Sequence, residues 1–453
     1  MTAHLPSAWR AHAGRNLPRY TSYPTAVGFE PVSDPGLTQA WLAEIEPSQT
    51  LSAYVHVPFC RRLCWYCGCH TTVVHNYDRV AAFDAVLQAE IDLWEQAMPA
   101  HAGLAHLHFG GGSPNALSPE AFARLVGRLS AAFALRPGAE IAVELDPGLL
   151  SDDFIDAAGA AGVTRASLGV QTLDAGVQHK VNRVQPFEQV AAVTGRLRAA
   201  GVDAVSFDLM YGLPGQTAEN VAASVEEALT LKPDRVSVFG YAHVPWMKKH
   251  QVMIREGELP GLDERWAQAE AADEALLAAG YVRLGLDHYA LAQDPLTLAQ
   301  EAGSLRRNFQ GYTDDPAPVL IPIGPSSIGR LPGGFVQNAA ATDAWSSAVS
   351  SGRLPTARAL RLTPDDDLRA AVIERLMCDL AADVGSICVE HGLGESALDG
   401  ALAQASMLQG DGLCRLDGRR ITIPKAAYRM MRVVAACFDA HLADGAGRHA
   451  KAV

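Results

Sequence analysis

The sequence has no apolar run approaching the ~20 residues that a membrane-spanning helix needs, so we expect no membrane insertion. It also lacks an excess of positive charge, because 50 acidic and 37 basic residues give a formal net charge of −13. No overall positive field would attract phosphate, and we expect no binding to nucleic acid. The first twenty residues lack the apolar core of an export signal, which favours a cytoplasmic location.

Cysteine is scarce over most of the chain, since four of the eight cysteines lie between residues 60 and 69. The other four are scattered through the last hundred residues. A secreted disulfide scaffold would be shorter and more evenly cross-linked, so a reducing, cytoplasmic location fits best. In such a location a tight group of thiols more often binds metal than forms disulfides.

The length of 453 residues suffices for one large catalytic domain and one smaller domain. Residues 1–45 are rich in Pro, Tyr and Ser without a long period, which predicts an N-terminal arm or lid. We expect a catalytic domain over residues 46–345. Helical patterns around one short strand-like stretch predict a mainly helical C-terminal domain over residues 346–453. Nothing in the sequence demands more than a monomer.

Between about residues 50 and 330, short β-rich apolar runs alternate with amphipathic helical stretches. We expect six strands, at residues 52–57, 106–109, 141–145, 166–170, 204–210 and 235–241. Such alternation predicts an α/β fold with a parallel sheet. Six units fall short of a closed eight-stranded barrel, so a partial (β/α)6 barrel is expected. The polar and glycine-rich stretches follow the strands, where such folds place their chemistry.

The cysteine stretch CRRLCWYCGC spaces Cys60, Cys64 and Cys67 as C-x3-C-x2-C. Three thiolates in one short loop can hold three irons of a [4Fe–4S] cube. The fourth iron is then open to a small molecule, to which it can pass one electron. The alternative is a zinc knuckle in a non-enzyme. Zinc usually takes two ligand pairs separated by a spacer, and the sequence has no second C-x2-C.

The cysteine spacing, with an aromatic residue at Tyr66, resembles the signature of the radical S-adenosylmethionine (radical SAM) enzymes. The longer stretch YVHVPFCRRLCWYCGCH is similar to the oxygen-independent coproporphyrinogen III oxidases, which carry a further cysteine at the position of Cys69. The resemblance covers about residues 15 to 385. It continues through RYTSYPTA (19–26), HFGGGSP (108–114), LGVQTLDAGVQHKVNRVQ (168–185), DLMYGLPGQT (208–217) and RNFQGYT (307–313).

The resemblance implies cofactors and their contacts. It assigns a [4Fe–4S] cluster to Cys60, Cys64 and Cys67, together with two SAM molecules. By motif position the first SAM would contact Tyr54, Gly111, Glu144 and Ile328. The second would contact Tyr66, Gly112, Ser113, Gln171, Arg183, Asp208 and Ala242.

Two positions depart from the pattern of the family. Ser113 stands where Thr is frequent, which keeps the hydroxyl group. In ELDPG, Gly148 replaces the Arg of the common E-x-D-P-R, which leaves the role of that Arg open. Among the expected catalytic residues, Cys69, Tyr54 and Gln310, the cysteine is functional in the family without being a cluster ligand. The alternative for Cys69 is a spare thiol packed beside the cluster.

The implied reaction is the oxidative decarboxylation of two propionates of coproporphyrinogen III to vinyl groups, which gives protoporphyrinogen IX without oxygen. An electron from an unidentified reductase, flavodoxin or ferredoxin would pass through the cluster to SAM. The resulting 5′-deoxyadenosyl radical would take a hydrogen from a propionate. In an acidic protein, local groups must hold the carboxylates of the substrate. The candidates are Arg19, Tyr20, Lys248, Arg307, Gln310 and Tyr312.

Two alternatives keep the same fold. One is a haem-binding, chaperone-like relative, although such relatives typically lack the extra cysteine and the RYTSYPTA arm. The other is a radical SAM enzyme that acts on a different tetrapyrrole.

Overall fold

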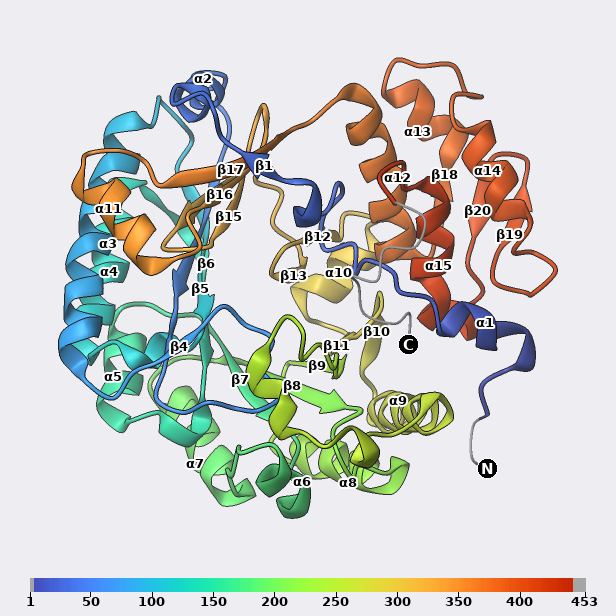
Figure 1. Cartoon of the computed structure of the whole chain (residues 1–453), viewed down its shortest axis with the longest axis horizontal. Coiled ribbons are helices and arrows are strands. Elements are labelled where there is room, and N and C mark those ends of the chain that lie inside the picture. Colours follow the sequence, from blue (N-terminus) through green and yellow to red (C-terminus); the bar gives the residue numbers. More distant parts are fainter. Residues whose placement is uncertain (1–3, 443–453) are drawn as a thin grey trace.

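The computed structural model describes residues 4–442, which are organised around a 13-stranded sheet (Figure 1). Within this part of the chain, seven neighbouring strands of the sheet run parallel. In spatial order they are β14 (Val319–Ile323), β2 (Leu51–Val57), β5 (Leu104–Gly111), β6 (Leu135–Leu145), β7 (Arg165–Gln171), β8 (Ala204–Tyr211) and β9 (Arg235–Gly240). The strands β2 and β5 to β9 coincide with the six expected strands. The sheet stays open, which confirms the partial (β/α)6 barrel.

Short antiparallel strands extend the sheet at both ends. Beyond β14 lie β15 (Ile328–Leu331), β16 (Gly334–Asn338), β17 (Thr356–Arg361) and β1 (Glu30–Pro31). Beyond β9 lie β11 (His288–Ala290) and β10 (Val282–Leu284). Two separate ribbons are formed by β3 (Phe59–Cys60) with β4 (Thr72–Val73) and by β12 (Arg306–Asn308) with β13 (Gly311–Thr313).

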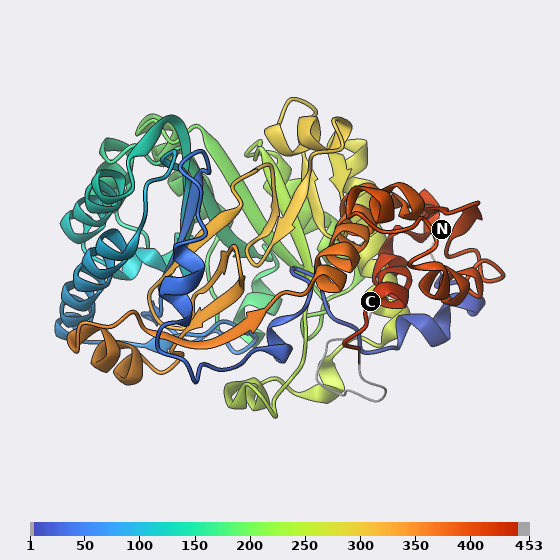
Figure 2. The same cartoon turned by 90° about the horizontal axis from the view of Figure 1, so that it is seen from above.

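Helices follow one another around the outer face of the sheet (Figures 1 and 2). They are α3 (Tyr77–Ala97), α4 (Pro119–Ala132), α5 (Asp152–Ala160), α6 (Ala175–Lys180), α7 (Phe187–Ala199), α8 (Ala218–Leu229), α9 (Leu262–Ala278) and α11 (Thr342–Ser350). The short helix α10 (Pro295–Glu301) instead packs between β10 and the C-terminal part. The start of α4 shows why the sequence forms a helix at this place. Ser118 Oγ accepts a hydrogen bond from the Ala121 amide at 3.2 Å. Phe122, Leu125 and Leu129 are then buried in the core of the sheet.

The C-terminal part is mainly helical and has a core of its own. It comprises α12 (Pro364–Asp379), α13 (Val384–Glu390), α14 (Asp399–Ser406) and α15 (Met431–Ala435), with β18 (Ala381–Asp383), β19 (Arg415–Asp417) and β20 (Arg420–Thr422). The strand β17 belongs to the main sheet although it follows residue 345, where we expected the domain boundary. The division into three domains remains a prediction.

The first 45 residues divide between the two cores. Leu17, Tyr20 and Tyr23 are buried in the C-terminal core, where α1 (Arg10–Ala13) also packs. Trp41 and Leu42, on α2 (Leu37–Leu42), are buried in the core of the sheet. The arm therefore ties the two parts of the molecule together. Between residues 4 and 442, no helix combines the length and apolar character that a membrane crossing requires.

Candidate active site

The cysteine loop leaves the sheet directly after β2. Its two ends are joined because β3, which ends at Cys60, pairs with β4. The Val74 amide donates to Cys60 O at 2.9 Å, and the Trp65 amide donates to Val181 O at 3.0 Å. These bonds hold the loop at the carboxyl-terminal edge of the parallel strands, as the order of motifs in the sequence predicts.

A cavity of about 160 Å³ lies between this loop and the ends of β5 to β8. We call it the cysteine cavity. Its lining includes the four loop cysteines Cys60, Cys64, Cys67 and Cys69. The structure also brings to it eight of the residues predicted to contact SAM, namely Tyr66, Gly111, Gly112, Ser113, Glu144, Gln171, Arg183 and Asp208.

Two glycines allow the loop after β5 to approach the cysteine loop closely. Gly111 has a φ of +112°, which side chains rarely adopt. A Cβ atom at Gly112 would lie 2.5 Å from Thr71 Oγ1 and 2.6 Å from Phe59 O. Any side chain at this position would therefore push the cysteine loop away. Because neither glycine carries a side chain, this side of the cavity stays open to a ligand.

Each of the three spaced cysteines receives a hydrogen bond at sulfur. Thr71 Oγ1 donates to Cys60 Sγ at 3.1 Å, and Arg183 Nη1 donates to Cys64 Sγ at 3.5 Å. The Cys69 amide donates to Cys67 Sγ at 3.4 Å. Burial raises the pKa of Cys60 to about 11. A hydrogen bond from the Cys69 side chain lowers the pKa of Cys67 to about 6, while the pKa of Cys69 rises well above its usual value.

The residue types that line the cavity fit an iron–sulfur cluster, because they include the three spaced cysteines. A single zinc ion needs ligands that converge to about 2.3 Å from one point. In a [4Fe–4S] cube each thiolate binds a different iron, so thiols distributed around a cavity are compatible with it. The donors that line the cavity therefore suit an iron–sulfur cube.

Two carboxylates face the cavity from β6 and β8. Glu144 Oε1 lies 2.9 Å from His108 Nε2, and Glu144 Oε2 lies 3.4 Å from the Gly111 amide nitrogen. Burial alone would raise the pKa of Glu144, but the contacts with His108, the Gly111 amide and His56 together outweigh it, so the pKa lies below the usual value. Asp208 accepts a hydrogen bond from Ser167 Oγ at 3.1 Å. Burial, together with the charge of Glu144, raises the pKa of Asp208 to about 6.

A second, central cavity of about 300 Å³ adjoins the first, because Glu144, Ser167 and Asp208 line both. Tyr54, Gln310 and Tyr312 also line the central cavity. The Tyr312 hydroxyl donates to Met377 O at 2.9 Å, so its hydrogen is not available to a ligand. Within the described residues, the side-chain amide of Gln310 forms no hydrogen bond, which leaves it available to a ligand.

Other predicted residues lie outside these two cavities. Ile328 begins β15 and lines neither cavity, and Ala242 lines a third cavity together with Arg19. Lys248 Nζ donates to Cys69 O at 2.9 Å and so supports the cysteine loop. The remaining two residues stabilise the arm. Arg307 Nε donates to Tyr20 O at 3.1 Å, and the Tyr20 hydroxyl donates to Asp439 Oδ2 at 3.0 Å.

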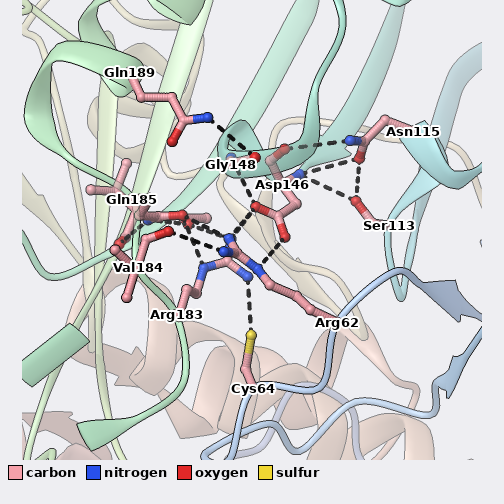
Figure 3. A network of polar contacts seen from close by, with 12 residues as sticks. Arg62, Cys64, Ser113, Asn115, Asp146, Gly148, Arg183, Val184, Gln185 and Gln189 are labelled. Atoms are coloured by element: carbon pink, nitrogen blue, oxygen red, sulfur yellow. Dashed lines mark hydrogen bonds and ion pairs between the residues drawn. The ribbon is translucent and has the colours of Figure 1, made fainter. Parts of the chain in front are cut away.

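A polar network that the sequence did not reveal links the cysteine loop to β6 and β7 (Figure 3). Its centre is Asp146, whose Oδ1 lies 2.8 Å from Arg62 Nη2 and 3.2 Å from Arg183 Nη2. Arg62 Nη1 also donates to Val184 O at 3.1 Å. The Asp-Pro-Gly sequence at residues 146–148 was a visible signal, since Asp146 Oδ1 accepts from the Gly148 amide at 2.9 Å. Nothing in the sequence indicated Arg62.

A family model of the radical SAM superfamily matches residues 54–228, which contain the cysteine loop and the strands β5 to β8. The fold and the cysteine cavity thus define a radical SAM protein, and this class implies a [4Fe–4S] cluster and SAM.

Relatives define the family more narrowly. The oxygen-independent coproporphyrinogen III oxidase of Bradyrhizobium diazoefficiens is 48% identical over 98% of both chains. The enzyme of that name from Paracoccus denitrificans is 40% identical over 96% of both chains. The solved structure of coproporphyrinogen III oxidase from Escherichia coli, described as a radical SAM enzyme, superposes with a TM-score of 0.90. It is 32% identical, and the superposition covers 94% of this chain and 100% of that one. The chain belongs to the family of oxygen-independent coproporphyrinogen III oxidases.

Proposed function

We propose that the protein converts coproporphyrinogen III into protoporphyrinogen IX in haem biosynthesis, by oxidative decarboxylation of two propionates without oxygen. One observation carries this proposal. The three spaced cysteines share one cavity with the glycine loop and with Glu144 and Asp208, at the active edge of the sheet. Relatives named for this activity match this chain over nearly its whole length.

In this proposal Cys60, Cys64 and Cys67 hold the cluster. When bound, the cluster and SAM supply the one-electron chemistry that removes a hydrogen atom from a propionate. The protein contributes position and charge. Gly111 and Gly112 let backbone approach the ligand closely. The low pKa of Glu144 keeps its carboxylate charged at neutral pH, so it can accept hydrogen bonds from ribose hydroxyls.

Two SAM molecules remain part of the proposal. The first would contact Tyr54, Gly111, Glu144 and Ile328. The second would contact Tyr66, Gly112, Ser113, Gln171, Arg183, Asp208 and Ala242. The common lining of the cysteine cavity supports both sets, apart from Tyr54, Ile328 and Ala242.

Cys69 would act on a neighbouring sulfur rather than bind iron. Its amide and its thiol both donate toward Cys67, and these hydrogen bonds stabilise the thiolate of Cys67. Lys248 holds the carbonyl of the same residue. An electron donor of flavodoxin or ferredoxin type would approach this loop, in which Arg61, Gly68 and Cys69 are exposed.

The central cavity is the proposed site of the tetrapyrrole edge that reacts. It adjoins the cysteine cavity through Glu144 and Asp208, and the free amide of Gln310 can orient a polar group of the substrate. Tyr54 faces the same space.

The test is an anaerobic assay with reconstituted protein, SAM, a reductant and coproporphyrinogen III. We expect protoporphyrinogen IX and 5′-deoxyadenosine from the wild type and neither from Cys64→Ser. Cys437→Ser, which alters a half-buried thiol outside the loop, is the matched control and retains activity. Deoxyadenosine without a decarboxylated product would instead indicate another tetrapyrrole substrate. Tight haem binding without turnover would indicate the chaperone-like relative.

A further inference from the structure

A third cavity, of about 510 Å³, opens where β8 and β9 end. This volume lies in the range of small-molecule sites. Among the described residues, its lining holds the four arginines Arg19, Arg265, Arg429 and Arg432. We call it the arginine cavity. It opens at the carboxyl-terminal edge of the parallel strands, where the cysteine loop also lies.

The guanidinium of Arg265 is held in this cavity by an aromatic ring and a backbone carbonyl, and two glycines leave space for it. Arg265 lies in the first turn of α9, and its guanidinium sits 5.4 Å from the centroid of the Tyr211 ring. Its Nη1 donates to Tyr241 O at 3.0 Å. A Cβ atom at Gly240 would lie 3.0 Å from Arg265 Nη2, and one at Gly212 would collide with Nη1. Two glycines at the strand ends therefore leave room for this guanidinium.

Arg19 reaches the same strand end from the N-terminal arm. Its Nη2 donates to Gly240 O at 3.1 Å, and its Nη1 lies 3.6 Å from Asp287 Oδ2. The arm is fixed here because Arg307 Nη2 donates to Arg19 O at 3.3 Å. Arg19 and Arg265 thus converge at the end of β9 with like charges.

The carboxylates of the cavity leave the charge of Arg265 uncompensated. Asp287 pairs with Arg19, and Glu256 lies 3.5 Å from His243. Arg429 has its own partner, because its Nε lies 2.7 Å from Glu270 Oε1. Within residues 4–442, Arg265 has no carboxylate within ion-pair distance. Burial and the charge of Arg19 lower its pKa below the usual value. A partly buried guanidinium beside a second cation favours an anion between them.

We propose that Arg265 and Arg19 together bind a carboxylate of the substrate, namely a propionate of the tetrapyrrole. This inference rests on the proposed function, which supplies a substrate with four propionates. A guanidinium presents paired N–H donors that match the two oxygens of a carboxylate. The carboxylate of SAM has the same chemistry, and Ala242, which also lines this cavity, is a proposed SAM contact. The experiment must therefore separate the two sources.

The test is a fluorescence titration of the protein with coproporphyrin III, the stable oxidised form of the substrate, and with its uncharged tetramethyl ester. We expect Arg265→Gln to weaken coproporphyrin III binding about 10- to 100-fold, as expected for hydrogen bonds between charged groups. Binding of the ester and of SAM stays unchanged. Arg265→Lys retains part of the affinity, since lysine keeps the positive charge but lacks the paired N–H donors of a guanidinium. Thermal unfolding of each variant verifies that it is folded.

Two further variants complete the test. Arg19→Gln, from a different segment, produces the same selective loss even if Arg265→Gln does not fold. Arg353→Gln removes one positive charge from an exposed turn outside the cavity and leaves Kd unchanged.

Three results separate the inference from the proposed function. An unchanged Kd for coproporphyrin III in both cavity variants, with normal turnover by the wild type, overturns the inference and leaves the function standing. Weakened SAM binding in place of weakened coproporphyrin III binding also overturns it. In the third result, the two cavity variants selectively lose coproporphyrin III binding, but the wild type does not decarboxylate coproporphyrinogen III. This result supports the site and overturns the proposed function.

Discussion

A Cβ atom at position 148 would lie 2.5 Å from Arg62 Nη2, so the Arg62 guanidinium occupies the space that a side chain there would need. The same guanidinium pairs with Asp146 at 2.8 Å. The resemblance of ELDPG to E-x-D-P-R left the role of that Arg open, and in this chain Arg62 brings a guanidinium to Asp146 from the cysteine loop. The glycine and Arg62 are therefore two parts of one arrangement.

Gly148→Ala is expected to destabilise the protein by about 1 kcal/mol, because the new methyl group displaces the end of the Arg62 side chain and weakens its ion pair with Asp146. The backbone at Gly148 does not require glycine, since its φ lies outside the left-handed region. The cost should therefore shrink when Arg62→Ala is combined with it. Urea unfolding of the wild type, both single variants and the double variant measures this coupling. Strictly additive effects would contradict the arrangement.

Asp208→Asn is expected to make the protein more stable at neutral pH. The pKa of Asp208 is raised from 3.8 to about 6 in the folded protein. The folded state thus binds this proton more tightly, and the free energy of unfolding falls as the pH rises from about 4 to about 6. The asparagine variant avoids this loss and gains about 1–3 kcal/mol above pH 6.

Urea unfolding of the cluster-free protein between pH 5 and 7.5 checks this, and the advantage of the variant should narrow toward pH 5. Asp203→Asn, at an exposed position just before β8, is the control and should show no such trend. If Asp208 also serves the site as proposed, the more stable variant loses activity. A difference in unfolding free energy between Asp208→Asn and the wild type that does not change with pH would refute the raised pKa of Asp208.

Substitution of the loop cysteines should divide them into two classes. Cys60→Ser, Cys64→Ser and Cys67→Ser are expected to lose most of the iron and the visible absorption of the reconstituted protein. Cys69→Ser should keep both, because Cys69 only donates hydrogen bonds toward Cys67. Iron analysis and absorption spectra after anaerobic reconstitution distinguish the classes. Loss of iron in the Cys69 variant would make that residue a ligand.

Arg183→Gln is expected to lower the reduction potential of the cluster by about 50 mV. Arg183 donates to Cys64 Sγ, and donors to the sulfurs stabilise the reduced, more negative cluster. One hydrogen bond of about 1 kcal/mol corresponds to roughly that shift for one electron. A potentiometric titration followed by electron paramagnetic resonance measures it. Arg62→Gln is the control, because Arg62 pairs with the same Asp146 without such a contact to sulfur. Equal shifts in both variants would assign the effect to Asp146.

Six of the seven parallel strands were predictable because each contains a short apolar run that alternates with amphipathic helical stretches, whereas β14 was not expected. The short antiparallel strands β10, β11 and β15 were not predictable either, since three or four residues leave no clear local pattern. The place of the arm was not predictable either. Leu17, Tyr20 and Tyr23 are buried against residues about 400 positions later in the sequence, and only long-range packing specifies this.

The site could be predicted where chemistry depends on residue type and spacing, as for Cys60, Cys64 and Cys67. It could not be predicted where function depends on space that another residue leaves free. The position of Arg62 depends on the absence of a side chain at Gly148, and that of Arg265 depends on the absence of one at Gly212. Relationships of this kind become visible only when distant segments are placed side by side.

The central claim is that three thiolates hold the cluster and leave one iron open to SAM. Mössbauer spectroscopy of protein reconstituted with ⁵⁷Fe, with and without SAM, tests it most directly. We predict that the signal of about one iron in four changes when SAM is added, in the wild type and in Cys69→Ser alike. A spectrum that SAM leaves unaltered, or protein isolated without air that contains zinc in place of iron, would contradict the account.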